Sequence, residues 1–137
     1  MSNKYISQQE GYVIGTELVP ITLTASFDDN VNVVHMGNKS QMQLYIDYTP
    51  AQDGRKISVQ IEGSPNGSRY YKKVTSDISS GTETWSIKVG TFTGTTGGVT
   101  YPIEVSEPVA DKSIRISVKE DGSANFGTVS IQFLKSG

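Results

Sequence analysis

Cysteine is absent from the 137-residue chain. Without cysteine a protein has no disulfide, no zinc–thiolate site and no cysteine nucleophile. Long apolar runs are also missing, and no stretch approaches the roughly 20 apolar residues that a membrane helix needs. Residues 1–11 are polar and lack the apolar segment of a secretory signal peptide. We therefore expect a single domain that folds without disulfides and has no membrane partner.

Clusters of positive charge are scarce as well. The chain has 12 Lys and Arg against 14 Asp and Glu, a formal net charge of −2. Its basic residues are scattered singly apart from two adjacent pairs, at 55–56 and 72–73. A nucleic-acid surface needs clustered Lys and Arg, so we expect no nucleic-acid partner.

Strand patterns, in contrast, are abundant, whereas no window shows helical periodicity longer than two turns. The clearest stretch is 41–73, in which Met42, Leu44, Ile46 and Tyr48 alternate with polar residues. After a turn, an apolar set at 57, 59 and 61 alternates in the same way. Successive strand side chains point to opposite faces, so each strand has one apolar face and one polar face. This pattern is typical of an antiparallel sheet buried on one side.

The rest of the chain repeats this pattern in eight or nine short strands, which predicts an all-β antiparallel β-sandwich. A jelly-roll and an immunoglobulin-like connectivity both fit, although the Cys-Trp-Cys marker of immunoglobulin domains is missing. We expect a polar loop at 77–83 and one strand at 84–92. The predicted core residues are Ile46, Ile57, Val59, Ile61, Trp85, Ile87, Ile116, Val118, Ile131 and Phe133.

The N-terminal segment differs from the rest. We divide the chain into an arm, residues 1–17, and a sandwich domain, residues 18–137. A short arm cannot bury much area within its own domain, and ordering it costs roughly 1–2 kcal/mol per residue. We therefore expect the arm to order against a neighbouring subunit, by pairing with a sheet edge or lying in a groove. The interface residues would be the apolar ones of the arm: Tyr5, Ile6, Tyr12, Val13 and Ile14.

Candidate catalytic or metal-binding residues are few. The chain has one histidine, His35, within a predicted strand, where a lone histidine is usually structural. Asp28, Asp29 and Asn30 share one loop, but they lack the spacing of a calcium-binding loop and fit ordinary turn chemistry. We expect a protein that is not an enzyme and has no cofactor or bound metal.

Three tyrosines are candidates for a binding surface. Tyr45 falls on the polar face of its strand, and alternation forces Tyr70 or Tyr71 outward. Exposed aromatic residues suit stacking on sugars or insertion into a protein partner. Cross-strand pairing that stabilises the sheet is the competing interpretation.

Two segments resemble a known class of proteins. The stretches DGRKISVQIEGSPNGSRYYK and ADKSIRISVKEDGSANFGTVSIQFLK are similar to small β-sandwich structural proteins of tailed-bacteriophage virions, over roughly residues 41–134. The resemblance implies a non-enzymatic virion component, such as a capsid decoration or a neck or tail accessory protein. It also implies localisation in the virion, with other virion proteins and copies of itself as partners. A carbohydrate-binding β-sandwich module that contacts a host surface glycan through its tyrosines is the alternative.

Overall fold

The computed structural model describes residues 11–14 and 19–137, which form twelve strands and one short 3₁₀ helix, η1 (Phe27–Asp29). The strands are β1 (Gly11–Ile14), β2 (Ile21–Thr22), β3 (Val31–His35), β4 (Gln41–Thr49), β5 (Arg55–Ser64), β6 (Tyr71–Lys72), β7 (Val74–Ser79), β8 (Thr82–Ile87), β9 (Val89–Gly94), β10 (Tyr101–Pro108), β11 (Ser113–Glu120) and β12 (Thr128–Ser136). Among these residues, no helix is long and apolar enough to cross a bilayer.

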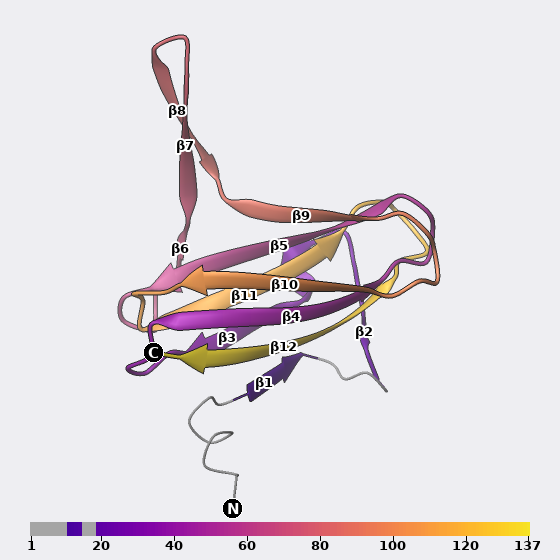
Figure 1. Cartoon of the computed structure of the whole chain (residues 1–137), viewed down its shortest axis with the longest axis horizontal. Coiled ribbons are helices and arrows are strands. Elements are labelled where there is room, and N and C mark those ends of the chain that lie inside the picture. Colours follow the sequence, from indigo (N-terminus) through magenta and orange to yellow (C-terminus); the bar gives the residue numbers. More distant parts are fainter. Residues whose placement is uncertain (1–10, 15–18) are drawn as a thin grey trace, which may run out of the picture.

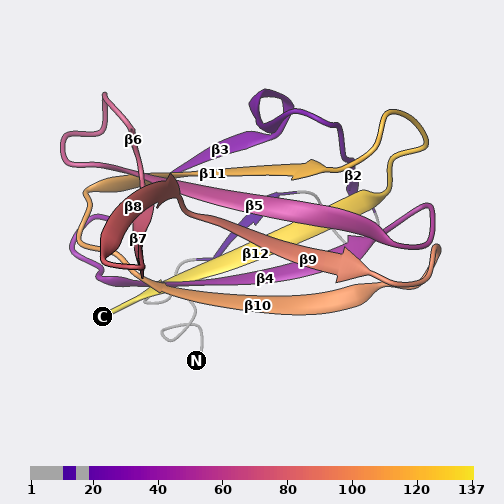
Figure 2. The same cartoon turned by 90° about the horizontal axis from the view of Figure 1, so that it is seen from above.

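Two antiparallel sheets form the sandwich (Figures 1 and 2). In the first sheet the order is β1-β12-β4-β10, with β2 also pairing with β12. The second has β3-β11-β5, and β6 and β9 both pair with β5. Along the chain β3, β4 and β5 alternate between the two sheets, and so do β9, β10, β11 and β12. This arrangement is that of a jelly roll, which decides between the two connectivities that the sequence leaves open.

The core lies between the sheets and follows the predicted alternation. In the first sheet Ile131 lies opposite Ile46, and in the second Ile116 lies opposite Ile61. Six of the ten predicted core residues are fully buried: Ile46, Ile57, Ile116, Val118, Ile131 and Phe133. Val59 and Ile61 are partly buried and pack against this cluster.

The prediction is wrong for Trp85 and Ile87. Trp85 is 66% exposed and Ile87 is 49% exposed. Residues 84–92 do not form one strand, because β8 ends at Ile87 and β9 begins at Val89. The expected polar loop at 77–83 is also wrong, since these residues belong to β7, a turn and the start of β8. Strands β7 and β8 form a hairpin of their own, outside both sheets.

This hairpin is an insertion into an edge strand of the second sheet. Lys72 in β6 lies opposite Glu62, and Val89 in β9 lies opposite Gln60, two positions further along the same side of β5. Between them the chain leaves the sheet, and the Lys88 amide donates to the Lys73 carbonyl (2.8 Å) where it returns. Figure 1 shows the hairpin standing away from the sandwich beyond β9.

Candidate interaction surfaces

The β7–β8 hairpin has one apolar and one polar face. Residues directly opposite in an antiparallel pair point to the same side. Val74 lies opposite Ile87, and Trp85 lies opposite Ser76, with Ile78 next toward the tip. The alternate pairs form the polar face, where Thr75 Oγ1 and Ser86 Oγ are 3.4 Å apart. All four large apolar side chains of the hairpin, Val74, Ile78, Trp85 and Ile87, are exposed.

The turn at the tip explains why the sequence forms a hairpin here. Ser80 and Gly81 connect Ser79 to its partner Thr82, and both have positive φ angles, 52° and 78°. Two positive φ angles match the tight turn whose twist suits paired strands. A Ser-Gly dipeptide between two alternating runs is a turn signal, so the hairpin was visible in the sequence.

An apolar slot opens between the edge strands β9 and β10. It has a volume of about 210 Å³ and is lined by inward side chains of both sheets, among them Val59, Ile61, Ile103 and Val105. Lys73 and Lys88, at the base of the hairpin, also line it. Their ammonium groups pair with Asp111 (3.0 Å) and Glu107 (2.9 Å). The core is therefore not completely covered along this edge.

A polar groove crosses the outer face of the second sheet, with a volume of about 420 Å³. Its floor includes Gln60, Glu62 and Arg115, which alternate with inward-facing core residues. Arg115 donates twice to the Glu62 carboxylate, at 2.9 Å for each bond. This pairing raises the pKa of Arg115. The Arg115 guanidinium also lies over the ring of Tyr70, 4.9 Å from its centroid.

The three predicted surface tyrosines do not share a surface. Tyr45 is half-buried on the outer face of the first sheet, and its hydroxyl donates to Gln43 Oε1 (2.9 Å). Tyr70 and Tyr71 lie at the edge of the second sheet, where Arg69 lies 5.4 Å from the ring centroid of Tyr71. Tyr70 contacts the groove through Arg115.

Of the predicted arm residues, three have partners within the chain. Tyr12, Val13 and Ile14 lie in β1, whose backbone pairs with β12 as the edge strand of the first sheet. The backbone of these residues thus has a partner within the chain, and their contact with a neighbouring subunit stays a prediction. Tyr5 and Ile6 lie outside the described residues.

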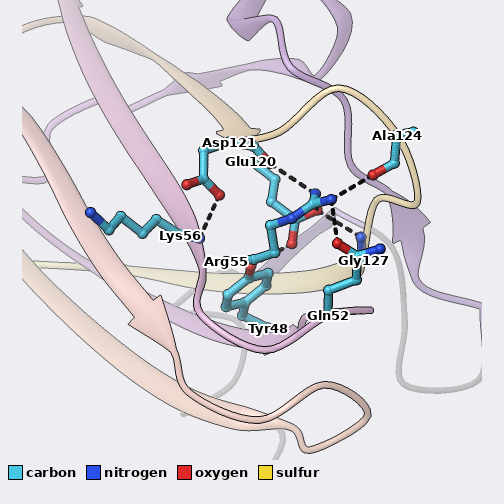
Figure 3. Close-up of polar contacts among 8 residues, drawn as sticks. All are labelled: Tyr48, Gln52, Arg55, Lys56, Glu120, Asp121, Ala124 and Gly127. Atoms are coloured by element: carbon cyan, nitrogen blue, oxygen red, sulfur yellow. Dashed lines mark hydrogen bonds and ion pairs between the residues drawn. The ribbon is translucent and has the colours of Figure 1, made fainter.

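A buried polar cluster joins the ends of β4, β5 and β11 (Figure 3). Glu120 is fully buried, accepts a hydrogen bond from the Tyr48 hydroxyl and one from the Gly127 amide (2.8 Å), and pairs with Arg55 (3.6 Å). Arg55 also donates to the carbonyls of Asp121 (3.0 Å) and Ala124 (2.7 Å). Burial, followed by the bond to Glu120, raises the pKa of Tyr48.

This cluster is structural. A Cβ at position 127 would overlap the Thr49 carbonyl oxygen, so glycine allows the chain to pass close to the end of β4, where the Gly127 amide donates to Glu120. Because a buried charge is tolerated only when its hydrogen bonds are satisfied, the cluster fixes the loop after β11 against β5.

The other candidates from the sequence have ordinary surroundings. His35 Nδ1 lies 2.8 Å from Ser113 Oγ, and Ser113 is itself buried. Asp28 and Asp29 lie in η1, whose first residues are capped by Ser26. Within residues 11–14 and 19–137, no group of three or more His, Cys, Asp or Glu side chains is placed to hold a metal.

Comparisons with known proteins bear on the fold. No protein-family model matches the chain, and no curated protein matches it. Among solved structures, dimeric latent PorU from Porphyromonas gingivalis superposes with a TM-score of 0.51 at 12% identity, covering 93% of this chain and 12% of that chain. A carbohydrate-binding module specific for non-crystalline cellulose, CBM28, gives a TM-score of 0.43 at 10% identity. The match covers 93% of this chain and 73% of that chain. At this identity the first likeness concerns the fold alone.

Proposed function

We propose that the chain is a non-enzymatic structural protein that works by subunit–subunit assembly, with the β7–β8 hairpin as its docking element. The observation that carries the proposal is the exposed apolar face of this hairpin, formed by Val74, Ile78, Trp85 and Ile87.

The physical argument concerns what keeps such a hairpin ordered. An isolated two-stranded hairpin is only marginally stable in water, because it has no third strand or helix to cover its apolar face. Contiguous exposed apolar surface is rare on monomeric proteins and marks interaction sites. Tryptophan is also among the residues that contribute most to protein interfaces. A partner that covers Trp85 would stabilise the hairpin and bury its largest side chain.

The resemblance to phage virion proteins supplies a setting for this proposal. In a virion, many copies of one subunit are present, so weak contacts between single copies are enough to hold the assembly together. Each bound neighbour raises the effective concentration of the next. The partners would be copies of this chain and other virion proteins. Mass spectrometry of purified particles tests this setting: the chain is expected as a stoichiometric component, and its absence from the particles would contradict it.

Self-assembly itself is tested by multi-angle light scattering after size exclusion. The monomer has a mass of 14.8 kDa. We expect the average mass to rise above this value as the concentration of the full chain increases. A mass of one chain at every concentration would contradict self-assembly.

Glycan binding is the second candidate, and the polar groove on the second sheet favours it. The groove offers hydrogen-bonding groups from Gln60, Glu62 and Arg115, and Tyr70 is stacked against Arg115. Polar groups combined with an aromatic ring are what a sugar site needs. Isothermal titration with soluble host polysaccharides should then show heat that is lost in Arg115→Ala and kept in Tyr45→Ala, which alters the opposite sheet. No heat at millimolar sugar would reject this candidate.

A further inference from the structure

We infer that the polar groove on the second sheet binds a neutral saccharide, and that Gln60 and Ser117 on its floor hydrogen-bond to the sugar. This inference rests on the second candidate function, glycan binding, and names both the class of glycan and the residues that contact it. Two buried polar side chains carry it, because neither has a partner in the part of the chain that the structure describes.

These two polar side chains lie next to each other on the floor of the groove. Gln60 in β5 is directly opposite Ser117 in β11, so both point to the outer face of the sheet. Gln60 is 5% exposed and Ser117 is 3% exposed, yet neither side chain makes a hydrogen bond to residues 11–14 or 19–137. Neither group is fully enclosed, so each can be reached from the groove. Since buried polar groups are nearly always hydrogen-bonded, solvent or a ligand in the groove must supply these bonds.

The ionic side chains of the groove favour a neutral ligand. Arg115 donates twice to Glu62, at 2.9 Å for each bond, and the Lys119 ammonium lies over an aromatic ring of η1, 4.7 Å from its centroid. The other charged groups of the lining are Lys72 in β6 and Asp28 in η1, which have opposite signs. An anionic polymer needs several cations that are free to pair with it. The groove therefore offers a ligand mainly neutral hydrogen-bonding groups.

One side of the groove is apolar and suits the C–H face of a sugar ring. The 3₁₀ helix η1 packs against β11 (Figure 2) and brings Phe27 to the groove. Val31 in β3 lies opposite Ser117 and lines the groove as well. A ring that packs on Phe27 and Val31 can turn its hydroxyls toward Gln60 and Ser117. An amide and a hydroxyl both donate and accept hydrogen bonds, as sugar hydroxyls do.

The position of the groove on a sheet face argues against a peptide ligand. An extended peptide adds to a sheet through the main chain of a free edge strand. Here β11 lies between β3 and β5, and β5 lies between β11 and the pair β6 and β9. The backbone groups of the floor are thus used in the ladders, and a ligand reaches only side chains. An uncharged ligand that is bound by a side-chain amide and a hydroxyl is best supplied by a polyhydroxyl compound.

Two-dimensional ¹H–¹⁵N NMR of the full chain tests the inference. The neutral probes are maltohexaose, laminarihexaose and mannohexaose, each added to about 10 mM, which nearly fills a site of millimolar affinity. Hexagalacturonate is the acidic counterpart. We expect at least one neutral hexasaccharide to shift the side-chain amide signals of Gln60, and hexagalacturonate to leave them unchanged.

Two substitutions test the contact residues. Gln60→Met keeps the length of the side chain and removes its amide, and Ser117→Ala removes the hydroxyl. Each should raise the Kd roughly threefold to tenfold, the usual worth of one neutral hydrogen bond. Both variants should melt within a few degrees of the parent, because neither removes a hydrogen bond within the described residues. Ser58→Ala is the matched control, since Ser58 lies on the same face of β5 but outside the groove lining, and it should bind like the parent.

The outcomes separate this inference from glycan binding in general. If a neutral sugar binds and both variants bind it as tightly as the parent, the contact lies elsewhere; the inference fails and glycan binding stands. Binding of hexagalacturonate alone would overturn the neutral class in the same way. If no sugar shifts any signal, the inference and glycan binding are rejected together, and subunit assembly is left to its own test by light scattering.

Discussion

Trp85 lies directly opposite Ser76 across the β7–β8 hairpin, and it remains 66% exposed although it is the only tryptophan of the chain. A large aromatic side chain paired with a small polar one leaves an open face on one side of a two-stranded ribbon. Trp85 therefore contributes little to the sandwich core, and it is the largest side chain that a partner on this face would cover.

Stability measurements on two substitutions separate these roles. Ile131→Ala should lower the free energy of unfolding by about 2–5 kcal/mol, because Ile131 is fully buried between the sheets. Trp85→Ala, measured at a dilution where the chain is monomeric, should change it little. Urea denaturation of the two variants checks this. An equal loss of unfolding free energy in both variants would show that Trp85 belongs to the core.

Removing residues 74–88 should leave a folded jelly roll. The deletion joins Lys73 to Val89, and Lys73 then falls opposite Ile61, between the existing pairs Glu62–Lys72 and Gln60–Val89. Strands β6 and β9 would merge into one edge strand with its register kept. We expect a cooperative thermal transition close to that of the parent. Deletion of residues 74–87 leaves one residue too many and is the control; because a one-residue slip reverses the side chains, it should melt earlier. Equal melting of the two deletions would contradict the proposed register.

Alkaline pH should reveal the bond from Tyr48 to Glu120. The pKa of Tyr48 is raised by burial and by this bond, above the value of about 10 of a tyrosine in an unfolded chain. The contribution of this group to stability is therefore fully present below pH 10, and it is lost as pH rises above that value. Tyr48→Phe should cost about 1.5–3 kcal/mol near neutral pH, the usual worth of a hydrogen bond to a charged group.

The same variant should lose stability less steeply above pH 10. Tyr45→Phe is the control, because it removes a tyrosine hydroxyl that bonds to Gln43 and not to a buried carboxylate. Thermal melts across this pH range provide the measurement, and parallel curves for parent and Tyr48→Phe would show that Tyr48 ionises normally in the folded state.

Deleting residues 2–17 tests the role of the N-terminal segment. Every buried core residue that the structure describes lies between Leu23 and Phe133, so the truncated chain should still fold. Its melting temperature should fall modestly, because β12 loses the ladder to β1. An unfolded product would mean that β1 is integral to the sandwich. If the truncated chain assembles as the full chain does, residues 1–17 are not the tether between subunits.

Much of the sandwich could be predicted from alternation alone. The apolar positions of β4, β11 and β12 were assigned correctly because each of these strands has a neighbour on both sides and a sheet above it. The same reasoning failed for Trp85 and Ile87. Alternation shows which side chains share a face, but it does not show whether anything covers that face. The Ser-Gly turn at 80–81 was the local signal that a hairpin begins before Trp85.

The polar cluster could not be predicted either. Glu120 follows Tyr48 by 72 positions in the sequence, and only the crossing of β4, β5 and β11 brings it to Tyr48 and Arg55. Tyr48 was placed on the apolar face correctly, but nothing in its own strand indicates an acidic partner. The jelly-roll connectivity likewise depends on pairings between distant strands, such as β12 with β4, that strand patterns alone do not specify.

The emission of Trp85 tests the central claim most directly, because a single tryptophan reports only on the hairpin. The account predicts that, as the full chain is concentrated through its assembly range, the emission maximum moves to shorter wavelength and iodide quenching decreases, in step with the rise in mass. Dilution should reverse both changes. Emission that stays at the wavelength of exposed tryptophan, with unchanged quenching while the mass doubles, would show that the subunits assemble without covering the hairpin and would contradict the account.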